Sequence, residues 1–330
     1  GSLLISAADG ATLKGIRIGG DLILAPGVTK DVTLVDCVIQ GNIRNYGTGE
    51  VRFEAPQITP ESTATKPSEV YKPGATLDRT LEYGGKTVPI YRDRPLNVFS
   101  DVDFIWTGEE NENQRRLEYL GGEFRTRYGI DVSSFQGEID WDAVADDNID
   151  FAMVRVGFRG TGTGSLNTDK YYEQNIRGAM RAGLETGVYF FAQAVTVEEA
   201  IEEADYVISL LDGLDINGPV AYDWEMHDST YRVYGTSPEM ATACAVAFCQ
   251  RIKDAGYTPM VYGGTYVTYM KYDQGALADY LSWYPEYKSE KSEKLCPTLV
   301  YHMDYWQFSS SRAVAGINGR VDMNIQFIRR

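Results

Sequence analysis

Two carboxylates, Asp223 and Glu225, flank Trp224 at the end of the apolar run 219–222. Side chains two positions apart on a strand point to the same face, so we expect the two carboxylates to lie side by side. Repulsion between them raises the pKa of one of the pair. A carboxylic acid held beside an ionised carboxylate is the arrangement that cleavage of a glycosidic bond requires. The triplet alone fits a solvated loop with two acids equally well. Its place after an apolar strand favours a catalytic pair of carboxyl groups.

Few side chains are available for other reaction chemistries. The two histidines, His227 and His302, are too few for a multi-histidine metal site, and the four cysteines include no C-x-x-C pair. A Ser-His-Asp triad is not expected, and the glycine-rich stretch 160–164 lacks the G-K-[ST] of a phosphate loop. We therefore expect neither a metal nor a cofactor. His227, two residues after Glu225, is expected to be a surface histidine, with substrate contact as the alternative.

Composition narrows the classes of partner. The chain of 330 residues carries 31 Lys and Arg against 47 Asp and Glu, a formal net charge of −16. This charge argues against nucleic acid and anionic membrane surfaces as main partners. No apolar run approaches the roughly 20 residues that cross a bilayer, so no membrane span is expected.

From about residue 128 onward, the sequence alternates between strand and helix patterns. Strands are expected at eight places: 128–132, 151–156, 187–191, 219–225, 260–262, 281–284, 305–308 and 321–325. Thr196 with Glu199, and Ser237 followed by Pro238, are helix-start signals. This alternation favours a parallel sheet closed into a barrel, with a doubly wound open sheet as the alternative. In a barrel the chemistry lies at the carboxyl ends of the strands, where Asp131, Asp223 and Glu225 fall.

The first 127 residues have a different composition. Short alternating runs over 1–55 repeat with a period of about 20 residues, which is typical of a β-solenoid. They resemble the right-handed β-helix repeats of bacterial surface proteins. Residues 56–75 are rich in proline and polar residues and are expected to be a linker, followed by a small β-rich segment over 76–127. The predicted organisation is therefore a β-rich module, a linker, a small β-rich segment and a barrel over 128–330.

Ordered motifs over 128–330 resemble the family 25 glycoside hydrolases, which are peptidoglycan N-acetylmuramidases, a class of lysozyme. The motifs are Gly129-Ile130-Asp131-Val132-Ser133-Ser134-Phe135-Gln136-Gly137, Ile139-Asp140-Trp141, Gly187-Val188-Tyr189-Phe190-Phe191, Asp223-Trp224-Glu225, Trp306-Gln307-Phe308-Ser309-Ser310 and Gly316-Ile317-Asn318-Gly319-Arg320-Val321-Asp322-Met323-Asn324. The resemblance implies an irregular α/β barrel of eight strands with fewer helices than a full (β/α)8 barrel. The sequence departs from many members at 155–160, where a small residue followed by an acid is common.

Carried over position by position, the resemblance implies that Glu225 is the general acid and that Asp223 is its partner carboxylate. Asp131 and Asp322 would complete an acidic floor. Aromatic residues near strand ends would line the cleft, although core packing explains about half of them equally well. The predicted sugar-binding residues are Tyr189, Tyr262, Trp283, Tyr287, Trp306 and Gln307.

The sequence thus predicts a secreted or cell-surface bacterial enzyme that cleaves the β-1,4 bond between N-acetylmuramic acid and N-acetylglucosamine. Peptidoglycan glycan strands are the expected partner, and the N-terminal region is expected to be a spacer or to dock on the wall. The close spacing of Asp223 and Glu225 favours retention of configuration. Asp223 could attack the sugar directly or orient the substrate's own acetamido group as the nucleophile, and the N-acetylated substrate that the family resemblance implies favours the second. The alternatives are a hexosaminidase acting on chitin-like chains and a non-catalytic wall-binding protein.

Overall fold

The computed structural model describes residues 2–6, 10–18, 20–35, 37–39, 43–54, 65–74, 76–108 and 115–330. The chain divides into two compact units, Gly1–Thr63 and Ala64–Arg330. Each is described by itself. The predicted linker lies outside the described residues up to position 64, and in its remainder the helix α1 (Pro67–Val70) forms and packs against helix α5 (Pro238–Asp254).

In the first unit, every strand pairing among the described residues is parallel. Strands β1 (Leu3–Ile5), β4 (Leu22–Leu24) and β7 (Ile43–Asn45) form one sheet, and β2 (Thr12–Lys14), β5 (Val32–Val35) and β8 (Val51–Glu54) form a second. Strands β3 (Arg17–Ile18) and β6 (Val38–Ile39) form a third. The side chains buried among them are Ile18, Leu22, Leu24, Val28, Val32 and Leu34. The spacing of paired strands matches the period of about 20 residues in the sequence.

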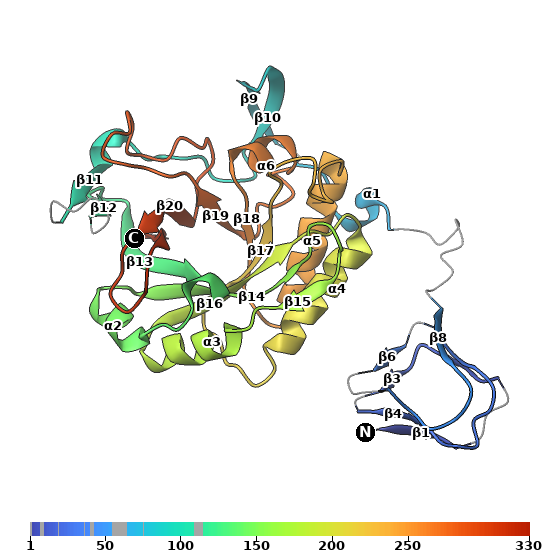
Figure 1. Cartoon of the computed structure of the whole chain (residues 1–330). Coiled ribbons are helices and arrows are strands. Elements are labelled where there is room, and N and C mark those ends of the chain that lie inside the picture. Colours follow the sequence, from blue (N-terminus) through green and yellow to red (C-terminus); the bar gives the residue numbers. More distant parts are fainter. Residues whose placement is uncertain are drawn as a thin grey trace. The chain divides into compact units, whose positions relative to one another are not determined.

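The second unit contains a closed barrel of eight strands (Figure 1), as predicted. In ring order the strands are β13 (Phe124–Val132), β14 (Phe151–Arg159), β16 (Glu185–Ala192), β17 (Val220–Trp224), β18 (Pro259–Tyr262), β19 (Leu281–Pro285), β20 (Tyr305–Arg312) and β21 (Val321–Arg329). Pairing of β13 with both β14 and β21 closes the ring and rules out the open doubly wound sheet. Strand β21 runs antiparallel to both of its neighbours, and the short β15 (Leu166–Thr168) pairs with β14 outside the ring.

Helices cover the outside of the first half of the barrel. Figure 1 shows α3 (Tyr172–Arg181), α4 (Val197–Leu210) and α5 against the outer face of β14, β16 and β17, and α2 (Trp141–Asp146) follows β13. The short α6 (Thr265–Met270) follows β18. Both helix-start predictions are confirmed, because the hydroxyls of Thr196 and Ser237 accept hydrogen bonds from the amides of Glu199 and Met240, 3.2 Å away in each case. The described residues that join β19 to β20 and β20 to β21 form no helix, which is the predicted shortage of helices.

The segment before the barrel forms two hairpins. Strands β9 (Leu77–Tyr83) and β10 (Lys86–Tyr91) meet at Gly84 and Gly85, whose φ angles of 57° and 74° suit a two-residue turn that glycine makes without strain. The short helix η1 (Asp101–Asp103) precedes β11 (Phe104–Thr107), which pairs with β12 (Arg116–Tyr119). Phe104 packs edge-on against Trp306 with 5.4 Å between ring centroids, so this segment covers part of the barrel wall.

Candidate active site

The four predicted catalytic carboxylates lie in one pocket of about 230 Å³ at the carboxyl ends of the barrel strands. Asp131 is near the end of β13 and Asp223 is near the end of β17. Glu225 is the first residue after β17. Asp322 comes from the beginning of β21, and because this strand runs antiparallel its first residues reach the same end of the barrel. Asp322 and Asp131 are register partners across the two strands.

Asp131 is 5% exposed and held by two amide side chains. Asn324 Nδ2 and Gln307 Nε2 donate to its Oδ2 at 2.8 and 2.9 Å. Burial raises the pKa of Asp131, and the two amide donors oppose that rise by stabilising the ionised form. The acid is thereby fixed in one orientation at the bottom of the pocket.

Asp223 is 4% exposed, and its Oδ1 has no hydrogen-bond partner among the described residues. Burial raises its pKa well above the ordinary value, and the charge of Glu225 and a hydrogen bond with Glu225 add to the effect. Burial also raises the pKa of Asp322 to about 8, with the charge of Asp131 contributing. Asp322 therefore holds a proton at neutral pH, and the raised pKa of Asp223 favours its neutral form, so the pocket carries less negative charge than its four carboxyl groups suggest.

Glu225 is positioned through its backbone. Its carbonyl oxygen accepts a hydrogen bond of 2.8 Å from Gln193 Nε2, and the preceding Trp224 donates from its indole to the carbonyl of Ala194 at 3.2 Å. On the solvent side, Glu225 Oε2 and His227 Nε2 lie 2.8 Å apart. The carboxyl group thus stands between the buried acid Asp223 and an exposed imidazole.

The predicted sugar-binding residues fall into two groups. Five line the pocket: Tyr189, Tyr262, Trp283, Tyr287 and Gln307. Three of them are joined by hydrogen bonds, because the hydroxyls of Tyr262 and Tyr287 both donate to Gln307 Oε1 at 3.1 Å. Trp283 donates from its indole to Asn324 Oδ1 at 2.8 Å. The aromatic wall and the support of Asp131 therefore share Gln307 and Asn324.

Trp306 does not reach the pocket, contrary to the prediction. Its side chain is fully buried in the main core, where its indole donates to the carbonyl of Glu286 at 3.0 Å. Successive residues of a strand face opposite sides, so Gln307 faces the barrel interior and Trp306 faces outward. The β11–β12 hairpin covers the outward side, and Phe104 packs against the indole there.

Other pocket residues were not assigned a role from sequence: Ser133, Phe135, Gln136, Arg155 and Phe191. Arg155 Nη2 pairs with Asp169 Oδ2 at 2.8 Å, and its guanidinium lies 5.2 Å from the ring centre of Phe135. Phe135 itself is 85% exposed. The stretch 155–160 lacks the family's common acid, and here Asp169, just before α3, supplies a carboxylate beside Arg155 instead.

A second cavity of about 320 Å³ continues from the pocket and shares Glu225, Tyr262 and Tyr287 with it. Its further lining comes from Met226, His227, Gly264, Thr265, Tyr266, Val267 and Pro285. Glu225 therefore lines both cavities. Within the residues that the structure describes, no group of His, Cys, Asp and Glu side chains is arranged to hold a metal ion, and no helix is long and apolar enough to cross a membrane.

Comparison with known sequences identifies related proteins for the barrel region. The pattern of glycosyl hydrolases family 25 matches residues 130–317, more than half of the chain. The autolytic lysozyme of Clostridium acetobutylicum is 26% identical over 197 residues, covering 59% of this chain and 54% of that protein. Lysozyme M1 of Streptomyces globisporus is 27% identical over 201 residues, covering 59% of this chain and 66% of that protein. The chain thus spans about half the length of the Clostridium relative.

Two solved structures share the fold. The spore cortex lytic enzyme SleM of Clostridium perfringens superposes with a TM-score of 0.53 at 22% identity, over 61% of this chain and 67% of that one. The modular autolysin LytC of Streptococcus pneumoniae gives a TM-score of 0.51 at 24% identity, over 74% of this chain and 57% of that one. At these identities the likeness concerns the fold.

Proposed function

Because the chain belongs to glycosyl hydrolases family 25, we propose that it is a muramidase that cleaves the β-1,4 bond between N-acetylmuramic acid and N-acetylglucosamine in bacterial peptidoglycan. The observation that carries the proposal is the pairing of buried Asp223, whose pKa burial raises, with Glu225, which lines both cavities. Two carboxyl groups that share one site are the machinery of glycosidic bond cleavage.

In the proposed mechanism, Asp223 and Glu225 share one proton before substrate binds. Burial and the neighbouring carboxylate favour that proton on Asp223 in the free enzyme. Substrate enters beside Asp223 and moves the proton to Glu225, which then donates it to the leaving oxygen of the glycosidic bond. Removal of the charge from one carboxyl lets the other ionise, since both cannot be ionised in one buried site.

We propose that the reaction retains configuration and uses the substrate's 2-acetamido group as the nucleophile. Once ionised, Asp223 accepts a hydrogen bond from the acetamido N–H and orients the acetamido oxygen towards the anomeric carbon. The C–O bond to the leaving sugar breaks as that oxygen bonds to the same carbon. Water then opens the cyclic intermediate, and Glu225 takes back a proton from the water.

Asp131 and Asp322 would form the floor of the sugar site. Asn324 and Gln307 orient Asp131 through its Oδ2, and we propose that its carboxyl group accepts from a sugar hydroxyl or amide. Tyr189, Tyr262, Trp283 and Tyr287 supply aromatic faces for the apolar C–H faces of the sugar rings. Exposed Phe135, against Arg155, extends that surface at the rim.

For the N-terminal unit we propose a short β-solenoid that docks on or spaces the enzyme from the cell wall. The parallel pairing of its strands and its own small core support an independent module. The predicted domain boundaries, with a module before residue 56 and the barrel from 128, stay a proposal, and the first barrel strand begins slightly earlier, at Phe124. We also propose that the protein is secreted or attached to the cell surface.

Mass spectrometry of the products released from purified sacculi tests the proposed function. A muramidase releases fragments that end in reducing N-acetylmuramic acid, whereas reducing N-acetylglucosamine ends would identify a different hexosaminidase. The matched control is Glu225→Gln, which keeps the shape of the side chain and removes its proton. Its rate should be lower by about 10²–10⁴-fold, the usual contribution of a general acid. Undiminished activity in a folded Glu225→Gln variant, or no product from the wild-type chain, would overturn the assignment.

A further inference from the structure

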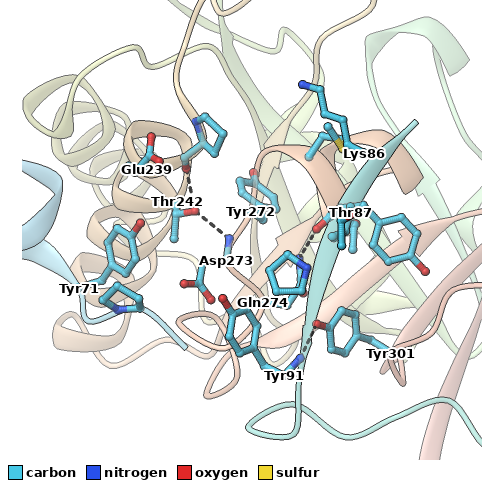
Figure 2. A pocket seen from close by; sticks show the side chains of 17 residues that line it. Tyr71, Lys86, Thr87, Tyr91, Glu239, Thr242, Tyr272, Asp273, Gln274 and Tyr301 are labelled. Atoms are coloured by element: carbon cyan, nitrogen blue, oxygen red, sulfur yellow. Dashed lines mark hydrogen bonds between the residues drawn. The ribbon is translucent and has the colours of Figure 1, made fainter. Parts of the chain in front are cut away.

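A cavity of about 350 Å³ in the second unit lies away from the catalytic carboxylates. Figure 2 shows Tyr71, Thr87 and Tyr91 on one side of it and Glu239 and Thr242 on another. The start of α5 and the second half of α6 thus line it opposite strand β10. None of its lining residues lines the pocket of Asp223 and Glu225. Its volume falls in the range of small-molecule sites, about 300–1,000 Å³.

One wall of this cavity comes from outside the family match, which begins at residue 130. Residues 71–91 supply Tyr71, Pro73 and the β10 strand, and the barrel supplies the opposite wall. Two hydrogen bonds join the walls: Gly74 N donates to Asp273 Oδ2 at 2.9 Å, and Tyr91 N donates to the hydroxyl of Tyr301 at 3.0 Å. A Cβ at Gly74 would come within 2.9 Å of the Gly275 Cα, so the two chains are in close backbone contact. Hydrogen bonds and close backbone packing therefore hold the two walls of the cavity together.

Tyrosine rings dominate the lining. Five contribute, Tyr71, Tyr91, Tyr269, Tyr272 and Tyr301. Such rings present flat apolar faces with a polar group at one end, which suits a ligand that is apolar on its face and polar round its edge. A pyranose ring has that character, because its C–H bonds cover the faces and its hydroxyl and acetamido groups lie at the edge.

Most polar groups in the lining already have partners. Asp273 Oδ1 accepts from the amides of Gly275 and Ala276, and the Gln274 amide accepts from Arg94. Two charged side chains in the lining differ from these groups in having no such partner. Lys86 on the hairpin side and Glu239 on the α5 side are exposed and make no hydrogen bond or ion pair with a described residue. They offer one cation and one anion to the polar edge of a ligand (Figure 2).

The cavity is adjacent to the catalytic groove through α6. The first half of this helix, Thr265 to Val267, lines the groove that continues from Glu225, and its second half, Thr268 to Met270, lines the tyrosine cavity. A helix of six residues is about 9 Å long at 1.5 Å per residue. Both sites also take lining residues from the segments that follow β17 and β18. A polymer that fills the groove can reach the cavity, as can a neighbouring strand of the same polymer.

We propose that this tyrosine cavity is a second glycan-binding site, which holds an N-acetylated pyranose unit of a cell-wall strand outside the catalytic groove. The inference rests on the proposed function. It predicts that the cavity raises affinity for the insoluble, multi-stranded wall and contributes little to turnover of a short soluble glycan, because a short glycan fills only the groove.

The test uses the full chain with Glu225→Gln to prevent digestion, and measures co-sedimentation with purified sacculi. Tyr91→Ala opens the cavity and Thr87→Trp fills it from the exposed β10 strand, so two opposite changes address the same site. Each should weaken sacculus binding at least tenfold. The matched control is Tyr234→Ala, which removes a tyrosine that is 54% exposed and outside both cavities, and it should bind as the parent does.

Two further measurements separate the possible failures. With Glu225 restored, Tyr91→Ala and Thr87→Trp should hydrolyse a short soluble glycan within about twofold of wild type; a loss of kcat there would mean that the cavity supports the barrel instead. On sacculi stripped of their peptides, the two cavity variants should still bind more weakly than the parent. If parent and variants bind these sacculi equally, a peptide is the ligand. Unchanged sacculus binding in both variants would also overturn the inference. The proposed function is judged separately, by whether wild-type protein releases reducing ends from the same sacculi.

Discussion

The imidazole Nε2 of His227 lies 2.8 Å from Oε2 of Glu225. The His227 side chain is the more exposed of the two, with 64% of its surface accessible. Sequence placed this histidine on the surface, with substrate contact as the alternative. The structure shows it on the surface and in contact with the proposed general acid. Its effect on Glu225 is weakened by water and salt, because an exposed ion pair contributes only about 0–1 kcal/mol.

We therefore expect His227→Ala to change kcat/KM by less than about fivefold, and the difference from wild type to shrink as ionic strength rises. The measurement is hydrolysis of a soluble glycan at low and high salt. His227→Gln serves as the control, because it keeps a hydrogen-bond donor without the charge. A loss of a hundredfold or more in His227→Ala would show that the imidazole takes a direct part in proton transfer.

The raised pKa of Asp322, about 8, predicts how stability depends on pH. Between about pH 6.5 and 8 the folded protein keeps the Asp322 proton, whereas the unfolded chain has lost it, since an ordinary aspartate titrates near 4. The folded state then binds more protons, and raising the pH favours unfolding. Asp223, whose pKa is also raised, acts in the same direction. His302, whose pKa is lowered by burial, acts in the opposite direction, but only below about 6.5.

Urea unfolding at pH 6.5 and pH 8 checks this expectation. The free energy of unfolding of the wild type should fall over that interval, and Asp322→Asn should reduce the fall, because the amide does not titrate. The variant should gain most relative to wild type at pH 8. A wild-type stability that rises from pH 6.5 to 8, or the same slope in both proteins, would contradict the protonated state of Asp322.

The second unit should fold without the first, and the structure gives the place to cut. Thr65 N donates to Glu198 Oε1 at 2.8 Å, and Tyr71 packs against the main core. A chain beginning at 64 keeps these contacts, unfolds in one transition and cleaves soluble wall fragments. A chain beginning at 76 lacks Val70 and Tyr71, so it exposes the core surface that these two side chains cover and should be less stable by about 2 kcal/mol. A folded but inactive chain from 64 would mean that the N-terminal unit shapes the active site.

The order of strands and the position of the acids followed from local patterns, because apolar runs and helix caps are properties of neighbouring residues. Thr196 and Ser237 illustrate this. What the patterns missed depended on contacts between distant parts of the chain. Trp306 was misplaced because nothing local reveals which face of β20 the hairpin β11–β12 covers. Similarly, α1 forms inside a proline-rich stretch because Pro67 suits the first turn of a helix and α5 packs against it.

Arg155 shows the same limit within the active site. Its sequence neighbours indicated only a departure from the family pattern, with no acid in the stretch. Its partner, Asp169, is 14 residues further along and is fully buried as a side chain beside it. A residue type that fits poorly at one position can thus be matched by a residue on the next element, and only the folded chain brings the two together.

Asp223 provides the sharpest test of the mechanism. Burial raises the pKa of Asp223 well above its ordinary value, which disfavours the fully charged carboxylate that direct attack on the sugar requires. This favours a role in orienting the acetamido group over direct attack on the sugar. Asp223→Asn keeps the shape but cannot take up the negative charge that holds the acetamido N–H as the cyclic intermediate forms. Its kcat should fall by about 10²-fold or more, as for loss of one preorganised electrostatic group.

The stereochemistry of the first product distinguishes the possible roles of Asp223. NMR of a digest at early times should show the β anomer, because two inversions at the anomeric carbon give net retention. Added azide should not restore activity to Asp223→Asn as a β-glycosyl azide, since the acetamido group already occupies the face that azide would attack. An α anomer released first would instead mean a single inversion by water. Asp223 would then lose its proposed role, and Asp131 or Asp322, which share the pocket, would be the candidates for the base that activates that water.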